Sequence, residues 1–239
     1  MTKKIIISFL VFLFCSSNKS EAQTTDSTII RTIYTETLAN AKAYEWLRDL
    51  CNNIGGRLSG SPEAAQAVKW AERTMKEAGA DTVWLQEVWV PHWVRGKKES
   101  AYIMDGSGLK QSVPVCALGG SIATPAKGIT AQVIEVNTFE ELKQLGEEKI
   151  KGKIVFFNHP FETKFINTFN AYGEAVEYRW RGPSEAARYG AVASIVRSMT
   201  LSQDDFPHTG AMHYADSVEK IPCCAISTNG ANLLSSIMK

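Results

Sequence analysis

The feature that most constrains this 239-residue chain is a charged turn that opens directly into an apolar run, residues 151–153 (KGK) followed by 154–157 (IVFF). Burial would penalise the charges of Lys151 and Lys153, whereas a run of β-branched and aromatic residues favours a strand that is covered on both faces. The boundary between turn and strand is therefore defined by residue type, and we predict a central strand at 154–157.

Three further apolar runs accompany this strand, at 129–136, 191–196 and 221–227. Short apolar runs separated by helical segments or loops are typical of a small α/β domain, because strands covered on both faces lose their polar alternation. We place this domain at residues 124–239, with a helix from Phe139 capped by Thr138 and a second helix over 182–190. We expect one core built from Ile154, Val155, Phe156, Ile195 and Ile226.

Residues 23–123 form the other predicted part. Apolar residues at three- and four-residue steps predict a helix over 26–53, broken near Asn40, and a second helix over 62–78 with Ser61 as its N-cap and an apolar inner face that includes Val68 and Met75. Strands are expected over 82–90 and 100–104. The segment 89–96 holds two tryptophans, a histidine and an arginine, which either line a binding cleft or pack at a strand end.

The N-terminus has the pattern of a secretory signal peptide. Two lysines precede an uncharged apolar run over residues 5–14, which is too short to span a bilayer. Positions 20 and 22 hold the small residues Ser20 and Ala22, as a signal-peptide cleavage site requires. We predict a signal peptide over residues 1–22, cleaved after Ala22, and a secreted or periplasmic protein without a stable membrane anchor. Phe14 before Cys15 disfavours a lipoprotein, whose lipidated cysteine follows a small residue.

Charge and cysteine content exclude some classes of protein. The chain carries 26 Lys and Arg against 25 Asp and Glu, without a block of like charges, so we expect no nucleic-acid partner. Four cysteines follow the signal peptide, and export permits disulfides among them. Cys223 and Cys224 are adjacent in an apparent strand and point to opposite faces, which favours buried thiols. The disulfide status of Cys51, Cys116, Cys223 and Cys224 stays open.

No complete active site can be assembled from these residues. Asp205, His208, His213 and Asp216 form the richest polar cluster, but their spacing matches no metal-binding motif. The chain has no nucleophile elbow and no complete phosphate-binding loop. We therefore expect no catalytic and no metal-ligating residues in this chain.

Several stretches, taken in order, resemble the secreted dizinc exopeptidases akin to carboxypeptidase Q, also called plasma glutamate carboxypeptidase. Two of them, 53–62 (NIGGRLSGSP) and 87–96 (EVWVPHWVRG), resemble the opening of these enzymes. The remainder resemble the protease-associated domain inserted in them: 151–155 (KGKIV), 178–182 (YRWRG), 190–198 (GAVASIVRS), 207–210 (PHTG), and 221–222 with 225–227 (IP, AIS).

The resemblance implies an α/β catalytic domain interrupted by the protease-associated insert, with the zinc ligands in the part that follows the insert. Its ligand motifs, a His-x-Asp, a Glu-Glu pair and a later Asp and His, have no counterpart here. We therefore expect the N-terminal part of an exopeptidase that acts on dipeptides or short peptides and uses two zinc ions as the full-length protein, with none bound by this chain. The resemblance implies a peptide substrate, and the full-length protein could form a homodimer. Alternatively, the chain is complete and its protease-associated unit is a non-catalytic binding module.

The loop over residues 202–220 holds the candidate binding residues His208, Thr209 and Gly210. Binding residues concentrate on loops carried by a rigid scaffold, so we predict that this loop forms part of a lid over the substrate cleft of the full-length enzyme. A solvated connection, in which Pro207 to Gly210 merely make a turn, is the alternative.

Overall fold

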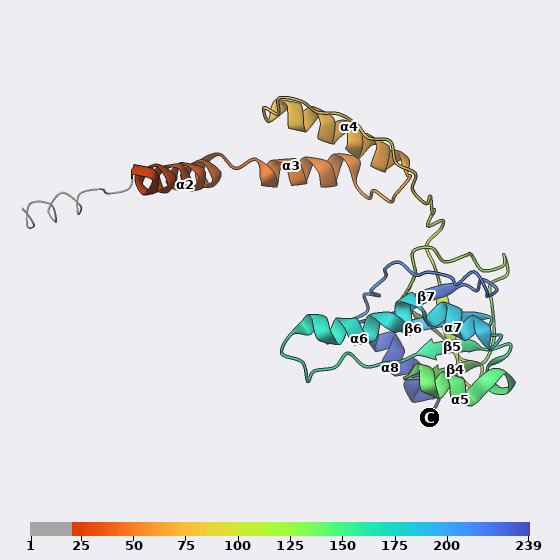
Figure 1. The fold of residues 1–239 in the computed structure, drawn as a ribbon. Coiled ribbons are helices and arrows are strands. Elements are labelled where there is room, and N and C mark those ends of the chain that lie inside the picture. Colours follow the sequence, from red (N-terminus) through yellow and green to blue (C-terminus); the bar gives the residue numbers. More distant parts are fainter. Residues whose placement is uncertain (1–20) are drawn as a thin grey trace, which may run out of the picture. The chain divides into compact units, whose positions relative to one another are not determined.

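The computed structural model describes residues 21–239, with side chains from residue 25 (Figure 1). The described chain divides into two compact units between His92 and Trp93. The predicted signal peptide lies outside the described residues except for Glu21 and Ala22. No helix in the described part of the chain is both long and apolar enough to cross a membrane.

The regular elements in the described part of the first unit are all helices. They are α2 (Glu21–Asn40), α3 (Ala43–Asp49), the π-helical turn η1 (Leu50–Ile54) and α4 (Pro62–Glu77), which confirms the predicted helices and the break near Asn40. The Ser61 side chain accepts a hydrogen bond from the backbone N–H of Ala64 at 3.1 Å, as expected of an N-cap. The indole of Trp70 on α4 donates to Asp49 at the end of α3 at 2.6 Å, which joins the two helices.

Two predictions for this unit are wrong. The expected strand over 82–90 does not form, because a strand needs a hydrogen-bonded neighbour and none of the described strands pairs with this segment. The expected inner face of α4 is largely exposed, with Val68 at 49% and Met75 at 54% of full exposure. The apolar periodicity therefore identified an apolar face of α4, but no described segment covers this face fully.

The second unit is built on a five-stranded sheet in the order β3-β7-β6-β5-β4. Its strands are β3 (Val115–Ala117), β4 (Val133–Val136), β5 (Ile154–Phe157), β6 (Ala193–Arg197) and β7 (Cys223–Ile226). β4 to β7 are parallel, and β3 runs antiparallel to β7 at the edge. β5 pairs with β4 on one side and with β6 on the other, which confirms the predicted central strand. A separate hairpin joins β1 (Ala101–Met104) to β2 (Lys110–Val113), confirming the strand expected over 100–104.

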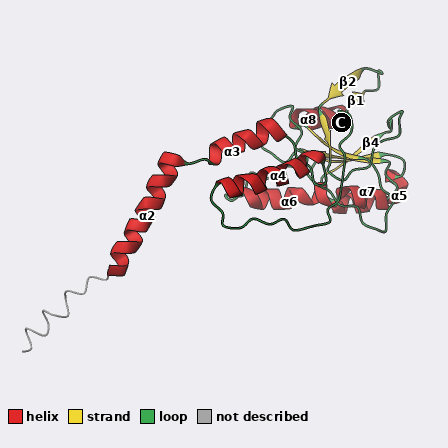
Figure 2. Ribbon diagram, turned by 90° about the horizontal axis from the view of Figure 1, so that it is seen from above, coloured by secondary structure: helices red, strands yellow, loops and turns green. Residues whose placement is uncertain are grey.

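Helices cover the sheet: α5 (Phe139–Ile150), α6 (Thr168–Trp180), α7 (Gly182–Arg188) and α8 (Thr228–Ile237). α5 connects β4 to β5, α6 and α7 connect β5 to β6, and α8 follows β7. α5, α6 and α7 lie on one side of the strands and α8 lies on the other (Figure 2). The predicted cap of α5 forms: Thr138 accepts from the backbone N–H of Glu141 at 3.1 Å. The Glu141 carboxylate reaches back one residue further than in the usual capping box, to the N–H of Asn137 at 2.6 Å.

The core is divided between the two faces of the sheet, so the prediction of one continuous core is wrong. Val155 packs on the side of α5 to α7, whereas Phe156 and Ile226 pack on the side of α8, with the partly buried Ile195 against them. Neighbouring residues in a strand point to opposite faces, so a sheet covered on both faces must separate them. Ile154 is only partly buried.

The α/β fold class is confirmed by this parallel sheet with its covering helices. β3 pairs with β7 although it precedes residue 124, so the compact unit of the structure starts at Trp93 and includes the segment before the predicted boundary. The boundary between the catalytic domain (23–123) and the protease-associated domain (124–239) stays a prediction.

Candidate functional site

The loop over 202–220 is fastened to the second unit by backbone and side-chain hydrogen bonds. The N–H of His208 donates to the buried hydroxyl of Ser198 at 2.8 Å, and the Thr209 hydroxyl donates to the carbonyl of Ala117 at 2.7 Å. Gly119 makes two backbone hydrogen bonds with this loop. Its N–H donates to the carbonyl of Gly210 at 2.8 Å, and its carbonyl accepts from the N–H of Met212 at 2.9 Å. The middle of the loop thus follows the segment after β3 as an isolated bridge.

Gly210 is held against the guanidinium of Arg179 on α6. A Cβ at this position would lie 2.5 Å from Cζ of Arg179, so no larger residue fits without displacing that side chain. Arg179 donates from Nη2 to the hydroxyl of Tyr172 at 2.7 Å, while its buried Nε has no hydrogen-bond partner in the described structure. The structure therefore supplies a packing reason for glycine at 210.

The polar residues of this loop do not converge on a metal site. His213 stacks on Trp180 with ring centroids 5.8 Å apart, and its carbonyl accepts from the buried Ser184 hydroxyl at 3.1 Å. Within residues 21–239, no group of three or more His, Cys, Asp or Glu side chains is placed to hold a metal ion. The zinc ions implied by the resemblance therefore do not fit this part of the protein, and no chemical step can be assigned to them here.

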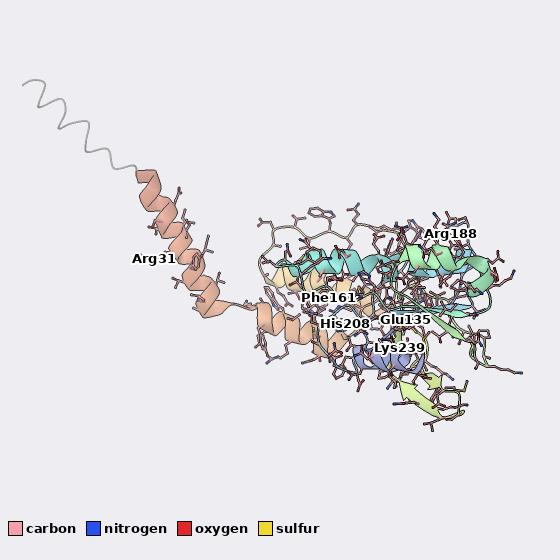
Figure 3. All side chains as sticks on the ribbon, turned by 90° about the horizontal axis from the view of Figure 1, so that it is seen from below. Arg31, Glu135, Phe161, Arg188, His208 and Lys239 are labelled. Atoms are coloured by element: carbon pink, nitrogen blue, oxygen red, sulfur yellow. The ribbon has the colours of Figure 1, made fainter. Side chains whose placement is uncertain are left out.

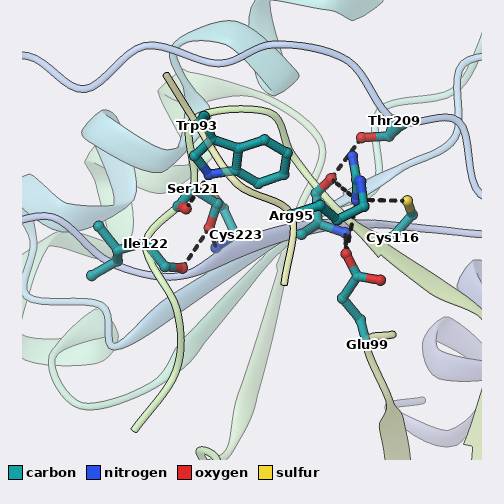
Figure 4. Close-up of polar contacts among 9 residues, drawn as sticks. Trp93, Arg95, Glu99, Cys116, Ser121, Ile122, Thr209 and Cys223 are labelled. Carbon is teal, nitrogen blue, oxygen red and sulfur yellow. Dashed lines mark hydrogen bonds and ion pairs between the residues drawn. The ribbon is translucent and has the colours of Figure 1, made fainter. Parts of the chain in front are cut away.

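An ion pair covers the outer edge of β3 (Figure 4). Glu99 accepts from the N–H of Ala117 at 2.9 Å, and Arg95 donates to the carbonyl of Ala117 at 3.1 Å and to Glu99 at 2.8 Å. Burial alone would raise the pKa of Glu99, but its hydrogen bonds, including those from Ala117 and Arg95, together lower it. The two side chains therefore satisfy backbone groups that an unprotected edge strand would offer to another chain.

The aromatic segment 89–96 divides into an exposed and a packed part. Trp89 is 96% exposed. In the second unit, the Trp93 indole donates to the carbonyl of Ser121 at 2.9 Å, and the Arg95 guanidinium lies 5.0 Å from the Trp93 ring centroid (Figure 4). Of the two interpretations given to this segment, these contacts favour packing for Trp93 and Arg95.

All four cysteines that the structure describes are free thiols. Cys223 is buried on the side of α5 to α7, as the strand alternation predicts, and its N–H donates to the Ser121 hydroxyl at 2.9 Å. Burial raises the pKa of Cys223, and it raises the pKa of Cys224 to about 12. A raised pKa disfavours the reactive thiolate at both positions. The prediction of buried thiols is confirmed for Cys223, whereas Cys224 is only partly buried.

A pocket of about 520 Å³ opens at the carboxyl ends of the parallel strands. Glu135 is in β4, Asn158 follows β5, and Arg197 is the last residue of β6; Ser235 of α8, Phe161 and Lys239 also line it. Of these side chains, Figure 3 labels Glu135, Phe161 and Lys239. Ligands of open α/β sheets commonly bind outside the carboxyl ends of the strands. The position of this pocket makes it the best candidate binding site in the described chain.

Hydrogen bonds fix the polar wall of this pocket. Asn158 donates to Glu135 at 2.6 Å and accepts from Nη1 of Arg197 at 3.1 Å; Ser235 donates to the same oxygen of Glu135 at 3.0 Å. Sequence analysis missed Glu135, Asn158 and Arg197. The available signal was their position, because each lies in or directly after the carboxyl end of a run predicted as a parallel strand.

Comparison with known proteins identifies the relatives of this chain. No known protein-family profile matches it. Carboxypeptidase Q from Xenopus laevis is 42% identical over 197 residues, and that from Homo sapiens is 39% identical over 197 residues; each match covers 82% of this chain and 39% of the relative. This chain is a homologue of carboxypeptidase Q.

This chain is also similar to a protein of known structure. The Peptidase M28 precursor from Shewanella amazonensis SB2B matches with a TM-score of 0.81 and 32% identity, over 90% of this chain and 48% of that chain. The match spans both compact units. The chain thus spans about two fifths of the length of the carboxypeptidase Q proteins that it matches.

Proposed function

We propose that this chain is the N-terminal part of a secreted, zinc-dependent exopeptidase that hydrolyses dipeptides or short peptides. The observation that carries the proposal is the alignment with carboxypeptidase Q, 42% identical over 82% of the chain, together with the fold shared with a peptidase of known structure. In this proposal residues 1–22 direct export, residues 23–123 begin the catalytic domain and residues 124–239 form the protease-associated domain.

The two zinc ions of the proposed enzyme would be held by residues outside this sequence. The support for this assignment is the absence, within residues 21–239, of any cluster of side chains suited to a metal, together with the greater length of the relatives. When bound, such ions would polarise the scissile carbonyl and activate a water molecule. The described residues would contribute the scaffold and the peptide-binding surfaces.

The test compares this chain with a protein of the relatives' length that contains it. The longer protein should release amino acids from a panel of dipeptides, lose this activity on chelation and regain it with zinc, whereas the 239-residue chain should be inactive and retain no zinc after dialysis. A folded, zinc-loaded longer protein that hydrolyses no dipeptide in the panel would overturn the proposed reaction. About two tightly held zinc ions on the short chain would overturn the placement of the metal site.

Within this function we retain the lid role of His208, Thr209 and Gly210 as a proposal. Its support is that the middle of the loop is fastened to Ser198 and Ala117, which gives His208 a defined position. In the longer enzyme, His208→Ala should raise KM or lower kcat while zinc content and Tm stay unchanged. The matched control is Asp205→Ala in the same loop. Kinetics equal to wild type for both variants would make the loop a connector only.

A non-catalytic binding module is the second candidate function. It is favoured by the complete five-stranded sheet between residues 93 and 239, with both faces covered and its β3 edge protected by Arg95 and Glu99. In that case the short chain should unfold in one cooperative transition and bind peptides without a catalytic partner. Aggregation of the chain at micromolar concentration would contradict this function.

A further inference from the structure

The pocket at the carboxyl ends of β4, β5 and β6 is lined by three charged side chains, Glu135, Arg197 and Lys239. Glu135 and Arg197 carry opposite charges but do not form an ion pair. The Asn158 amide lies between them, with its NH2 on Glu135 and its carbonyl oxygen on Arg197. All three side chains project from the α8 side of the sheet, because they continue the alternation of Val133, Phe156 and Ile195 on that face. A single amide thus holds a carboxylate and a guanidinium apart in one pocket.

Arg197 retains unused hydrogen-bonding capacity. Both of its side-chain hydrogen bonds use Nη1, to Asn158 at 3.1 Å and to Asn232 at 2.8 Å, and no described residue partners Nε or Nη2. The side chain is half-buried, and burial lowers the pKa of Arg197, partly opposed by the charge of Glu135. A desolvated guanidinium without an ion-pair partner gains by binding a carboxylate, for which its planar fork is suited.

Glu135 is the complementary group. One carboxylate oxygen accepts both hydrogen bonds from the chain, from Asn158 and Ser235, and the other oxygen has no partner among the described residues. An ammonium group is the natural partner of such a carboxylate. Because Glu135 shares the pocket with Arg197, its negative charge would weaken the binding of a ligand that carries only negative charge.

The pocket is preorganised on rigid elements. Glu135 and Arg197 start from β4 and β6, the parallel strands on either side of β5. Asn232, which accepts from Arg197, is itself fixed by donating to Gln203 at 2.8 Å. Phe161 and Leu201 provide an apolar part of the lining, and the volume of about 520 Å³ suits a small molecule. Side chains fixed in this way need little reordering when a ligand binds.

We propose that this pocket binds a small zwitterion, a free amino acid or dipeptide, with the ligand carboxylate on Arg197 and its amino group on Glu135. The proposal rests on the proposed function, since it names a second contact of the protein with the substrates or products of an exopeptidase. It places this contact in the protease-associated domain, on side chains that need no zinc.

The test is calorimetric titration of the zinc-free chain with alanyl-alanine, N-acetyl-alanyl-alanine, alanyl-alanine amide and inorganic phosphate. The unmodified dipeptide should bind best, and removal of either charge should weaken binding by about tenfold or more. In Arg197→Gln, alanyl-alanine should bind no more tightly than alanyl-alanine amide, because the group that binds the ligand carboxylate is gone. In Glu135→Gln, alanyl-alanine should bind no more tightly than N-acetyl-alanyl-alanine, because the group that binds the ligand amine is gone. Arg188→Gln on α7, on the opposite side of the sheet, is the matched control and should bind as wild type.

Circular dichroism and thermal melting verify that each variant is folded. If Arg197→Gln does not fold, Arg197→Lys keeps the charge without the fork and should weaken dipeptide binding about tenfold. The proposal is overturned if the folded wild-type chain binds no dipeptide up to about 10 mM, a limit equivalent to roughly −3 kcal/mol. It is also overturned if the acetylated or amidated peptides bind equally well, or if phosphate binds better than the dipeptide. Hydrolysis by a longer protein without dipeptide binding by this chain would refute this inference and leave the proposed function intact.

Discussion

Tyr214→Phe removes one oxygen atom from a buried hydrogen-bond centre, and its effect can be worked out from the structure. The Tyr214 hydroxyl donates to the carbonyl of Ile221 at 2.5 Å and accepts from the N–H of Ile122 at 3.1 Å, while the Tyr214 side chain packs in the core on the side of α5 to α7. Phenylalanine keeps the ring and leaves both backbone groups without this partner. Each unsatisfied buried group costs about 1–3 kcal/mol, and Ile122 lies near the surface, so we expect a loss of about 2 kcal/mol in the free energy of unfolding at pH 8.

The pKa of the Tyr214 hydroxyl predicts how this loss in the free energy of unfolding changes with pH. Burial is the main cause that raises the pKa of Tyr214 to about 12, from about 10 in the unfolded chain. A raised pKa means that the folded state holds the proton more tightly, so the stabilisation is complete below pH 10 and is lost as the pH rises towards 12. At pH 10.5 this linkage lowers the free energy of unfolding of the wild-type protein by about 1 kcal/mol and leaves that of the variant unchanged. The difference between them should therefore narrow by about that amount.

Urea unfolding at pH 8 and pH 10.5, followed by circular dichroism, measures both quantities. Tyr102→Phe is the matched control, because Tyr102 is 61% exposed and its hydroxyl has no hydrogen bond in the described structure; it should cost less than about 0.5 kcal/mol. Amide exchange at Ile122 should accelerate only in Tyr214→Phe. A difference between wild type and Tyr214→Phe that is near zero at pH 8, or that widens at pH 10.5, would refute the reasoning.

Three further predictions concern the same unit. Val155→Asp places an unpaired carboxylate at a position without solvent exposure and should cost about 4 kcal/mol or more, seen as loss of the cooperative melt; an unchanged Tm would contradict the position of β5. Glu99→Ala leaves the N–H of Ala117 open at the β3 edge and should increase aggregation in light scattering, whereas Glu99→Gln keeps an acceptor and should remain soluble. Iodoacetamide should modify the exposed Cys51 in the native chain and the buried Cys223 only after unfolding, and rapid native modification of Cys223 would contradict its burial.

Local sequence signals located many elements because they act over a few residues. The change from Lys153 to the apolar run fixed the start of β5, and the side chains of Ser61 and Thr138 cap their helices as their residue types predict. α6 and β3 were not predicted. α6 has weakly segregated apolar residues and depends on the burial of Ala171, Ala175 and Tyr178, and β3 has three residues that become a strand only by pairing with β7.

The candidate site could be predicted only in part for the same reason. The sequence singled out His208, Thr209 and Gly210 by their types within a polar loop, but it did not show that Gly210 lies against Arg179. It placed Glu135, Asn158 and Arg197 at or directly after the ends of apolar runs, but it did not show which of these ends share one pocket. Hydrogen bonds between side chains that are 23 and 39 residues apart depend on strand order, which no local pattern encodes.

The sequence by itself determined the α/β character of residues 124–239, the position of the central strand and the relationship to the carboxypeptidase Q family. These depend on residue types in short stretches and on their order along the chain. The tertiary structure alone decided that the core is split between two faces, that Arg95 and Glu99 close the β3 edge and that one amide holds Arg197 apart from Glu135. Each of these depends on which distant segments become neighbours, because burial and unsatisfied hydrogen bonds are properties of the assembled sheet.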